Sequence, residues 1–140
     1  MFASILTPLL ALILWTFVIW FWMYATRIPA MRVAGIDPAK LKRKDELDVL
    51  PTKVKQIADN YNHLHEQPTV FYALVIYRHL VGVIDPFNIG LAWAYVGLRV
   101  VHSLIQCTNN FVPLRFMVFA SSSLVLMVIA VRNVVALLSV

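Results

Sequence analysis

The sequence has few of the residues that soluble proteins use at their surfaces and in their cross-links. Only 14% of its 140 residues are charged, whereas 61% are hydrophobic, which lies outside the usual range for a soluble globular domain. Cys107 is the only cysteine, so no disulfide can form within the chain, and we interpret its thiol as a packing group. Strands of alternating polar and apolar residues are also lacking, which argues against a membrane β-barrel. The solvent around much of this chain is therefore lipid.

Long hydrophobic runs are present instead, and they define four segments. These segments cover residues 3–25, 57–81, 88–108 and 112–137. Each is close to the ~20 residues that an α-helix needs to cross a ~30 Å hydrocarbon core. The first has no basic start and no small-residue cleavage site, so we interpret it as a retained span rather than a signal peptide. Because short connections make consecutive helices antiparallel, the sequence predicts an all-α integral membrane protein, with residues 1–140 as one up-down four-helix bundle.

Charge is unevenly distributed along the chain. The loop over residues 26–56 carries eight of the twelve basic residues, namely Arg27, Arg32, Lys40, Lys42, Arg43, Lys44, Lys53 and Lys55. The positive-inside rule therefore predicts that this loop is cytoplasmic. Its "KLKRKDEL" run is short, interleaved with acids and free of aromatic residues, so we expect no nucleic acid partner. Asp37 and Pro38 predict the start of a short interfacial helix, which Pro51 would end.

Polar residues recur at helical spacing inside two of the predicted spans. In the third span, Arg99, His102, Ser103 and Gln106 fall on one face at i, i+3, i+4 and i+7. In the second span, Glu66 lies at a depth similar to that of Arg99. An unpaired charge at this depth is costly, so we predict a Glu66–Arg99 ion pair, either within one subunit or across two. The pair alone is compatible with a structural clamp or with a functional site.

Arg115 is the polar residue of interest at the start of the fourth span. A cation and the free backbone N–H groups of a helix N-terminus together stabilise a thiolate or another anion. With Arg99, this predicts a pocket open toward the cytoplasm that binds an anionic ligand, beside an apolar second molecule from the lipid. A metal site is the competing interpretation of His63, His65 and Glu66. We expect no metal, because residues at i and i+2 point to opposite sides of a helix.

The segments "LRVVHSL" and "FVPLR" resemble the MAPEG family, the membrane-associated proteins in eicosanoid and glutathione metabolism. Arg99-x-x-His102-Ser103 and Pro113-x-Arg115 look like the branch that holds the microsomal prostaglandin E synthases and glutathione transferases, here in a bacterial-type member. The resemblance implies a homotrimer with glutathione as co-substrate at the subunit interfaces. It also implies that Arg115 is the catalytic, thiolate-stabilising residue. The glutathione-binding residues expected on this basis are Asn62, His65, Glu66, Arg99, His102 and Ser103.

The second span departs from the family motif N-x-x-E-x-x-P. Asn62 and Pro68 have the right separation, but His65 takes the glutamate position, and Glu66 follows one residue later, a rotation of roughly 100° on a helix. Ala58 stands where the motif has an arginine. A one-residue bulge would return Glu66 to the motif's face.

Two hypotheses follow from the residues and the resemblance. The first is a glutathione-dependent transferase or peroxidase that acts on an apolar electrophile or lipid peroxide from the bilayer. The second is a non-catalytic MAPEG-like membrane protein that serves as an accessory or structural subunit of a larger complex. For either, we expect a multi-pass protein of a bacterial inner membrane, although the short loops fit an endoplasmic-reticulum membrane equally well.

Overall fold

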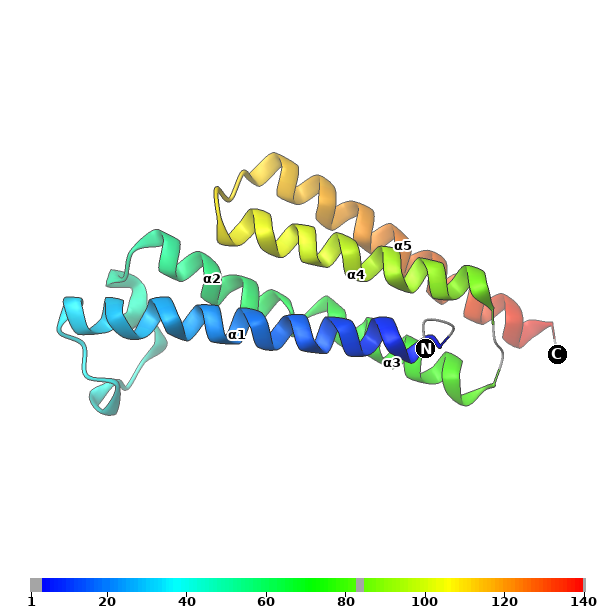
Figure 1. Cartoon of the computed structure of the whole chain (residues 1–140), viewed down its shortest axis with the longest axis horizontal. Coiled ribbons are helices and arrows are strands. Elements are labelled where there is room, and N and C mark those ends of the chain that lie inside the picture. The colour runs from blue at the N-terminus through cyan, green and yellow to red at the C-terminus, as the bar shows by residue number, and fades with distance from the viewer. Residues whose placement is uncertain (1–3, 83–84, 140) are drawn as a thin grey trace.

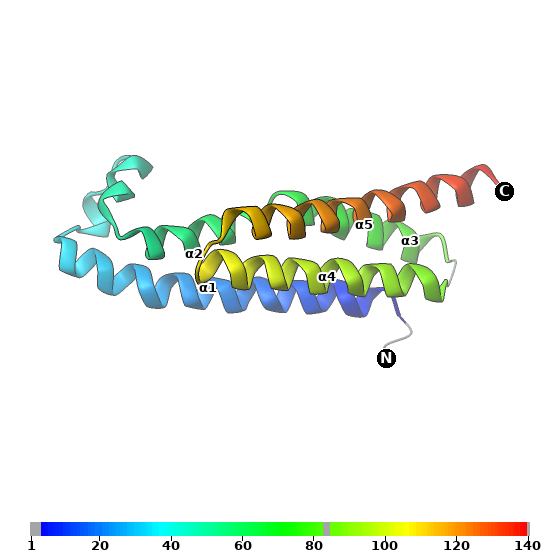
Figure 2. The same ribbon diagram turned by 90° about the horizontal axis from the view of Figure 1, so that it is seen from above.

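The computed structural model describes residues 4–82 and 85–139, and every regular element in them is helical. The helices form an elongated up-down bundle in which α1 and α4 run antiparallel to α2–α3 and α5 (Figures 1 and 2). The start of α1, the end of α3, the start of α4 and the end of α5 lie toward one end of the bundle (Figure 1). The prediction of an all-α up-down bundle is confirmed, and three of its helices are long and apolar enough to cross a membrane.

Helix α1 (Leu6–Ala34) extends well beyond the predicted first span of 3–25. It continues through Pro29 and ends at Gly35, which adopts a left-handed conformation with φ 73°. The Gly35 N–H donates to the Arg32 carbonyl at 3.2 Å and the Ile36 N–H donates to the Met31 carbonyl at 2.9 Å, a cap that suits glycine. Residues 26–34, predicted as part of the basic loop, are therefore helical.

The connection after α1 contains two 3₁₀ segments, η1 (Pro38–Lys40) and η2 (Lys44–Val49). Asp37 caps the first, since its carboxylate accepts a hydrogen bond from the Ala39 N–H at 3.0 Å, as predicted. The prediction of one continuous short helix was wrong. Leu41 has extended backbone angles, which interrupts helical hydrogen bonding after a single turn.

The second span consists of two helices, α2 (Thr52–His63) and α3 (Gln67–Leu80), rather than the one unbroken helix predicted over 57–81. Pro68 lies in the first turn of α3. Its nitrogen has no hydrogen to donate, and its ring would clash with the carbonyl of Leu64 in a continuous helix. Glu66 accordingly leaves the helical region, with φ −92° and ψ −96°. The break falls inside the bundle, where other polar groups can reach the freed backbone.

Helices α4 (Pro86–Cys107) and α5 (Val112–Leu138) match the predicted third and fourth spans within two residues. Asp85 caps α4 by accepting a hydrogen bond from the Phe87 N–H at 3.0 Å. The polar stripe of α4 faces inward as predicted, because Arg99, His102, Ser103 and Gln106 are all buried. Cys107 is a free, buried thiol within the hydrophobic core.

The apolar core lies between α1, α3 and α4, where Leu12, Ile19, Phe71, Val75 and Tyr95 are fully buried. The phenyl ring of Phe71 stacks on the Tyr95 ring at 4.6 Å. In contrast, much of α1 and α5 exposes large apolar side chains. In the described chain, α1, α4 and α5 are long and apolar enough to cross a membrane. Exposed apolar surface on such helices is expected to face lipid or other membrane helices.

Candidate functional site

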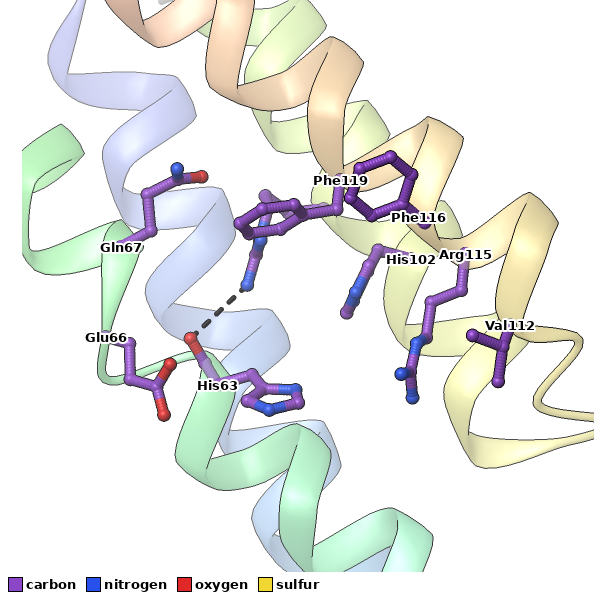
Figure 3. A pocket seen from close by; sticks show the side chains of 9 residues that line it. His63, Glu66, Gln67, His102, Val112, Arg115, Phe116 and Phe119 are labelled. Carbon is purple, nitrogen blue, oxygen red and sulfur yellow. Dashed lines mark hydrogen bonds between the residues drawn. The ribbon is translucent and has the colours of Figure 1, made fainter.

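A cavity of about 270 Å³ lies where the break between α2 and α3 faces α4 and the first turns of α5. Its walls combine charged, polar and aromatic side chains. Figure 3 shows His63 and Glu66 on one wall, with His102 and Arg115 on the opposite wall. The lining residues are His63, Glu66, Gln67, Arg99, His102, Val112, Arg115, Phe116 and Phe119.

The broken second span supplies a hydrogen-bond acceptor for Arg99. Its Nη2 donates to the His63 carbonyl at 3.3 Å (Figure 3). Arg99 is almost completely buried, at 1% exposure, yet its Nε and Nη1 atoms have no hydrogen-bond partner in the described residues. Within the described part of the chain, Arg99 and Glu66 form no ion pair. The prediction of that pair within one subunit is therefore wrong, whereas a pair across two subunits stays a prediction.

The reason for the missing ion pair lies in the geometry of the break. Leaving the helical region at Glu66 directs its exposed side chain to the rim of the cavity. Arg99 instead reaches the backbone at the end of α2. Carbonyl oxygens at a helix C-terminus carry partial negative charge, so they are suitable partners for a cation. One such neutral acceptor compensates a buried guanidinium only in part.

Arg115 lies in the first turn of α5, as the sequence predicted, and is held by a residue that the sequence analysis did not single out. Its Nη1 donates to the Asn110 side-chain oxygen at 2.8 Å. Asn110 has φ 51°, a left-handed conformation that asparagine tolerates better than most residues. The first turn of α5 has no acidic residue and no side-chain cap. A cation and uncompensated backbone N–H groups therefore occupy the same end of the cavity.

The side chains of Asn60, Gln106 and His63 form a polar cluster next to the ring of His102. The Gln106 oxygen accepts a hydrogen bond from the Asn60 amide at 2.9 Å and lies 3.1 Å from His63 Nδ1. The rings of His63 and His102 are 6.2 Å apart. His102 lines the cavity, while its buried Nδ1 and the buried Ser103 hydroxyl have no hydrogen-bond partner. Ser103 is fully buried and does not line the cavity.

Gln67 fixes the start of α3 against the other two helices. Its amide nitrogen donates to the Ser123 hydroxyl at 2.8 Å, and its oxygen accepts from the Tyr95 hydroxyl at 3.2 Å. These bonds join α3 to α5 and α4, respectively. Gln67 therefore holds the broken span in the position that forms the cavity wall.

Asn62 and His65 lie outside this cavity, although both were expected to bind the ligand. Asn62 is exposed and lines a separate cleft with Arg27 and Lys55. His65 is exposed, and its Nδ1 is 2.9 Å from the Tyr61 carbonyl. Because the helix ends at His63, the side chains that reach the cavity from this segment are instead those of His63, Glu66 and Gln67.

The rim of the cavity is aromatic. Phe116 is 64% exposed and Phe119 is 39% exposed, so both can contact molecules in the surrounding lipid. The Arg99 guanidinium lies 5.9 Å from the centre of the Phe119 ring, within the range of a cation–π interaction. The cavity thus has a cationic interior and an apolar opening.

The arrangement does not gather metal ligands in the described residues, where no three His, Cys, Asp or Glu side chains are close enough to share an ion. What it does gather is two arginines, two histidines and one carboxylate around a small cavity. Arginine guanidinium groups bind carboxylates and other oxyanions, often through paired hydrogen bonds. The chemistry of the site is therefore that of anion binding beside an apolar surface.

Fold and cavity together define a helical membrane protein with a polar site inside its bundle. The sequence model of the MAPEG family matches residues 5–135, which is nearly the whole chain. The protein therefore belongs to the MAPEG family, which includes glutathione-dependent transferases and peroxidases as well as non-catalytic members. No curated protein and no solved structure matches the chain.

Proposed function

We propose that the protein binds glutathione in this cavity and stabilises its thiolate, which then attacks an apolar electrophile or a lipid peroxide. The observation that carries the proposal is the buried guanidinium of Arg99, whose Nε and Nη1 have no partner beside a cavity that Arg115 also lines. Buried, incompletely paired cations are costly unless an anion completes them. Glutathione offers two carboxylates and an ionisable thiol to such a site.

The residues support distinct parts of this binding mode. Arg99 can pair with a carboxylate of the tripeptide through its free donors. Glu66, exposed at the cavity rim, is placed to accept hydrogen bonds from the ligand's ammonium group. Arg115 and the N-terminus of α5 stabilise the thiolate and so lower the pKa of the bound thiol. The aromatic rim formed by Phe116 and Phe119 receives the apolar co-substrate.

Two reaction types fit this arrangement. In a transfer reaction, the thiolate sulfur forms a bond to an electrophilic carbon, and the electron pair moves to the leaving group or to a carbon that is then protonated. In a peroxidase reaction, the sulfur attacks a peroxide oxygen, the O–O bond breaks and the lipid leaves as an alcohol. The sulfur now carries the hydroxyl group of a sulfenic acid; a second glutathione thiolate attacks this sulfur, the S–O bond breaks, the oxygen leaves as water and the disulfide forms.

The size of the cavity supports the further proposal of a homotrimer. A volume of about 270 Å³ is slightly below the range of ~300–1,000 Å³ that is typical of drug-sized ligands. One chain thus supplies only part of the walls that glutathione requires. In a trimer, an adjacent subunit would supply the rest, and Asn62 and His65, which lie on other faces, could contribute to a neighbouring site.

The orientation in the membrane is also part of the proposal. The basic residues of the first loop favour a cytoplasmic location for that end of the bundle. The cavity lies toward the same end, near the α4–α5 turn. We place the protein in a bacterial inner membrane, with glutathione entering from the cytoplasm and the lipid co-substrate from the bilayer.

A non-catalytic role as an accessory subunit is the second candidate. Ala58 supports it, because this residue is buried and carries no charge where the family motif has an arginine. The broad exposed apolar surfaces of α1 and α5 also leave room for a larger assembly. In that case the protein would co-purify with other membrane subunits and show no thiol chemistry.

The test is ultraviolet difference spectroscopy of the detergent-purified protein titrated with glutathione. We expect a saturable thiolate band in the wild-type protein and its loss in Arg115→Ala. Arg32→Ala, which removes an arginine from the last turn of α1, is the control and should keep the band. Glutathione binding measured by calorimetry, without a thiolate band, would favour the non-catalytic role. The absence of both binding and the band would overturn the proposal that glutathione is the ligand.

A further inference from the structure

A second polar cluster lies at the opposite end of the bundle, where α3 ends, α4 begins and α5 passes beside them (Figure 1). We call it the terminal network, and it consists of Arg78, Asp85, Asn88, Arg132 and Asn133. The Asp85 carboxylate lies between the two arginines, hydrogen-bonded to Arg132 Nη2 and 3.8 Å from Arg78 Nη2. Two asparagine oxygens also accept hydrogen bonds, Asn133 from Arg78 at 3.3 Å and Asn88 from Arg132 at 2.7 Å.

The terminal network is short of acceptors and of negative charge. Arg78 Nε, Asn88 Nδ2 and Asn133 Nδ2 are buried and have no hydrogen-bond partner. Arg78, Asn88 and Asn133 are 5%, 1% and 5% exposed, respectively, and a buried donor without a partner is destabilising. Two guanidinium groups face one carboxylate, which leaves an excess of one positive charge. An anion would supply both the missing acceptors and the missing charge.

The surroundings indicate where that anion comes from. The Arg132 side chain is 38% exposed, and its guanidinium lies 4.5 Å from the centre of the Phe87 ring. Phe87, Val131 and Val135 are 58%, 60% and 57% exposed, so apolar surface borders the only well-exposed cation of the network. Asp85 is the residue before α4 begins, which places the network at helix ends rather than in the middle of a span. Arginines near helix ends reach toward the lipid headgroups.

We propose that the terminal network is a binding site for the phosphate of an anionic phospholipid, whose acyl chains lie along the exposed apolar surface of α5 and Phe87. The phosphate oxygens would accept hydrogen bonds from Arg132 and from the unpaired donors of the network. A net negative lipid is favoured over a zwitterionic one, because the network carries one excess positive charge. Free inorganic phosphate has the same oxyanion chemistry but lacks the acyl chains.

The proposal can be tested on the full chain, delipidated in a neutral detergent. Native mass spectrometry and thermal unfolding would be measured with phosphatidylglycerol, with phosphatidylcholine and with inorganic phosphate alone. We expect phosphatidylglycerol to bind at one site per chain and to raise the Tm, with phosphatidylcholine binding at least ~10-fold more weakly because its choline cation is repelled by the excess positive charge of the network.

Asn133→Asp is the informative variant because it keeps the side-chain shape and supplies the missing negative charge within the protein. We expect it to reduce phosphatidylglycerol affinity at least ~10-fold. Asn109→Asp is the matched control, since this asparagine lies in the exposed α4–α5 turn, and it should bind the lipid as the wild type does. Arg132→Gln, at the exposed side of the network, provides a second variant with the same expected loss.

Each outcome decides the proposal. Equal binding of phosphatidylglycerol and phosphatidylcholine, or unchanged binding in both Asn133→Asp and Arg132→Gln, would overturn it. A saturable Tm increase with phosphate alone that matches the lipid would keep the oxyanion site but overturn the lipid as its source. If no anion binds at all, the proposal is overturned: water would then hydrogen-bond the unpaired donors, and the network would have a purely structural role. None of these measurements depends on glutathione binding in the other cavity.

Discussion

The two polar clusters of this bundle use arginine in opposite ways. In the terminal network, the Asp85 carboxylate lies between two arginines and holds α3, α4 and α5 together. In the cavity near the α4–α5 turn, Glu66 and Arg99 line the same space without forming an ion pair in the described chain. The first arrangement joins three helices, whereas the second leaves a buried, incompletely paired cation in the wall of a cavity. The position of the carboxylate therefore separates a cluster that joins three helices through ion pairs from a cluster whose buried arginine has no carboxylate partner in the described chain.

Removing the central carboxylate should have the largest effect on stability. Asp85→Asn leaves both arginines without a charged partner, and we expect it to lower the stability of the detergent-purified protein by about 2 kcal/mol. Thermal unfolding followed by circular dichroism measures this loss. Glu46→Gln, in the exposed η2 segment, is the control and should leave the Tm unchanged. A Tm for Asp85→Asn equal to that of the wild type would contradict the role assigned to this residue.

The same substitution should alter the pH dependence of stability. The hydrogen bond from Arg132 holds the pKa of Asp85 below its usual range, so the native state favours the ionised form. Its contribution is fully present above the ordinary aspartate pKa of about 3.9 and is lost as the pH falls through the lowered value. The Tm difference between the wild type and Asp85→Asn should therefore be constant near neutral pH and shrink in acid.

Replacing the incompletely paired Arg99 should change the stability in the opposite direction. Arg99→Met keeps a similar length but removes a buried charge that has one hydrogen bond. We expect the ligand-free protein to gain about 1 kcal/mol of stability while losing glutathione binding by at least ~10-fold. Thermal unfolding and calorimetric titration on the same sample measure both effects. A loss of stability as large as that of Asp85→Asn would show that the two clusters do not differ as described.

The smallest effect is expected at the residue that orients Arg115. Asn110→Gly keeps the left-handed backbone conformation but removes the acceptor for the Arg115 guanidinium. We expect little change in Tm. The thiolate should lose ~1 kcal/mol of stabilisation, the value of one hydrogen bond, and the glutathione thiolate band should weaken accordingly. Asn109→Gly is the neighbouring control. A thiolate band of wild-type strength in Asn110→Gly would mean that Arg115 needs no such positioning.

Periodicity and span length were sufficient to predict much of this fold. The inward face of α4, with Arg99 and His102 buried, followed from the spacing of polar residues in an apolar helix. Arg115 likewise lies in the first turn of α5, as the sequence predicted. These features depend on local helix geometry and on the cost of exposing charge to lipid, both of which can be evaluated from one sequence.

The second span could not be predicted in the same way. A regular helix over 57–81 places Asn62 and His65 at motif positions, whereas the break at Glu66 changes the register of every side chain around it. Pro68 was a visible signal for that break. The particular angles at Glu66, and the His63 carbonyl that Arg99 reaches as a result, depend on contacts with α4 that lie far away in the sequence. The role of Asn110 was missed for a similar reason, because only the folded turn brings it to Arg115.

The interruption of the second span also bears on how the protein enters a membrane. Helix α3 has 14 residues, fewer than the ~20 needed to cross the hydrocarbon core, and α2 contains the charged and amide side chains that translocon insertion disfavours. Among the described helices, the three long apolar ones can partition into the bilayer individually, and neither α2 nor α3 belongs to that set. We therefore expect insertion of this span to depend on its assembly with α1 and α4, which would make membrane insertion and tertiary folding a single step for the segment that forms the cavity wall.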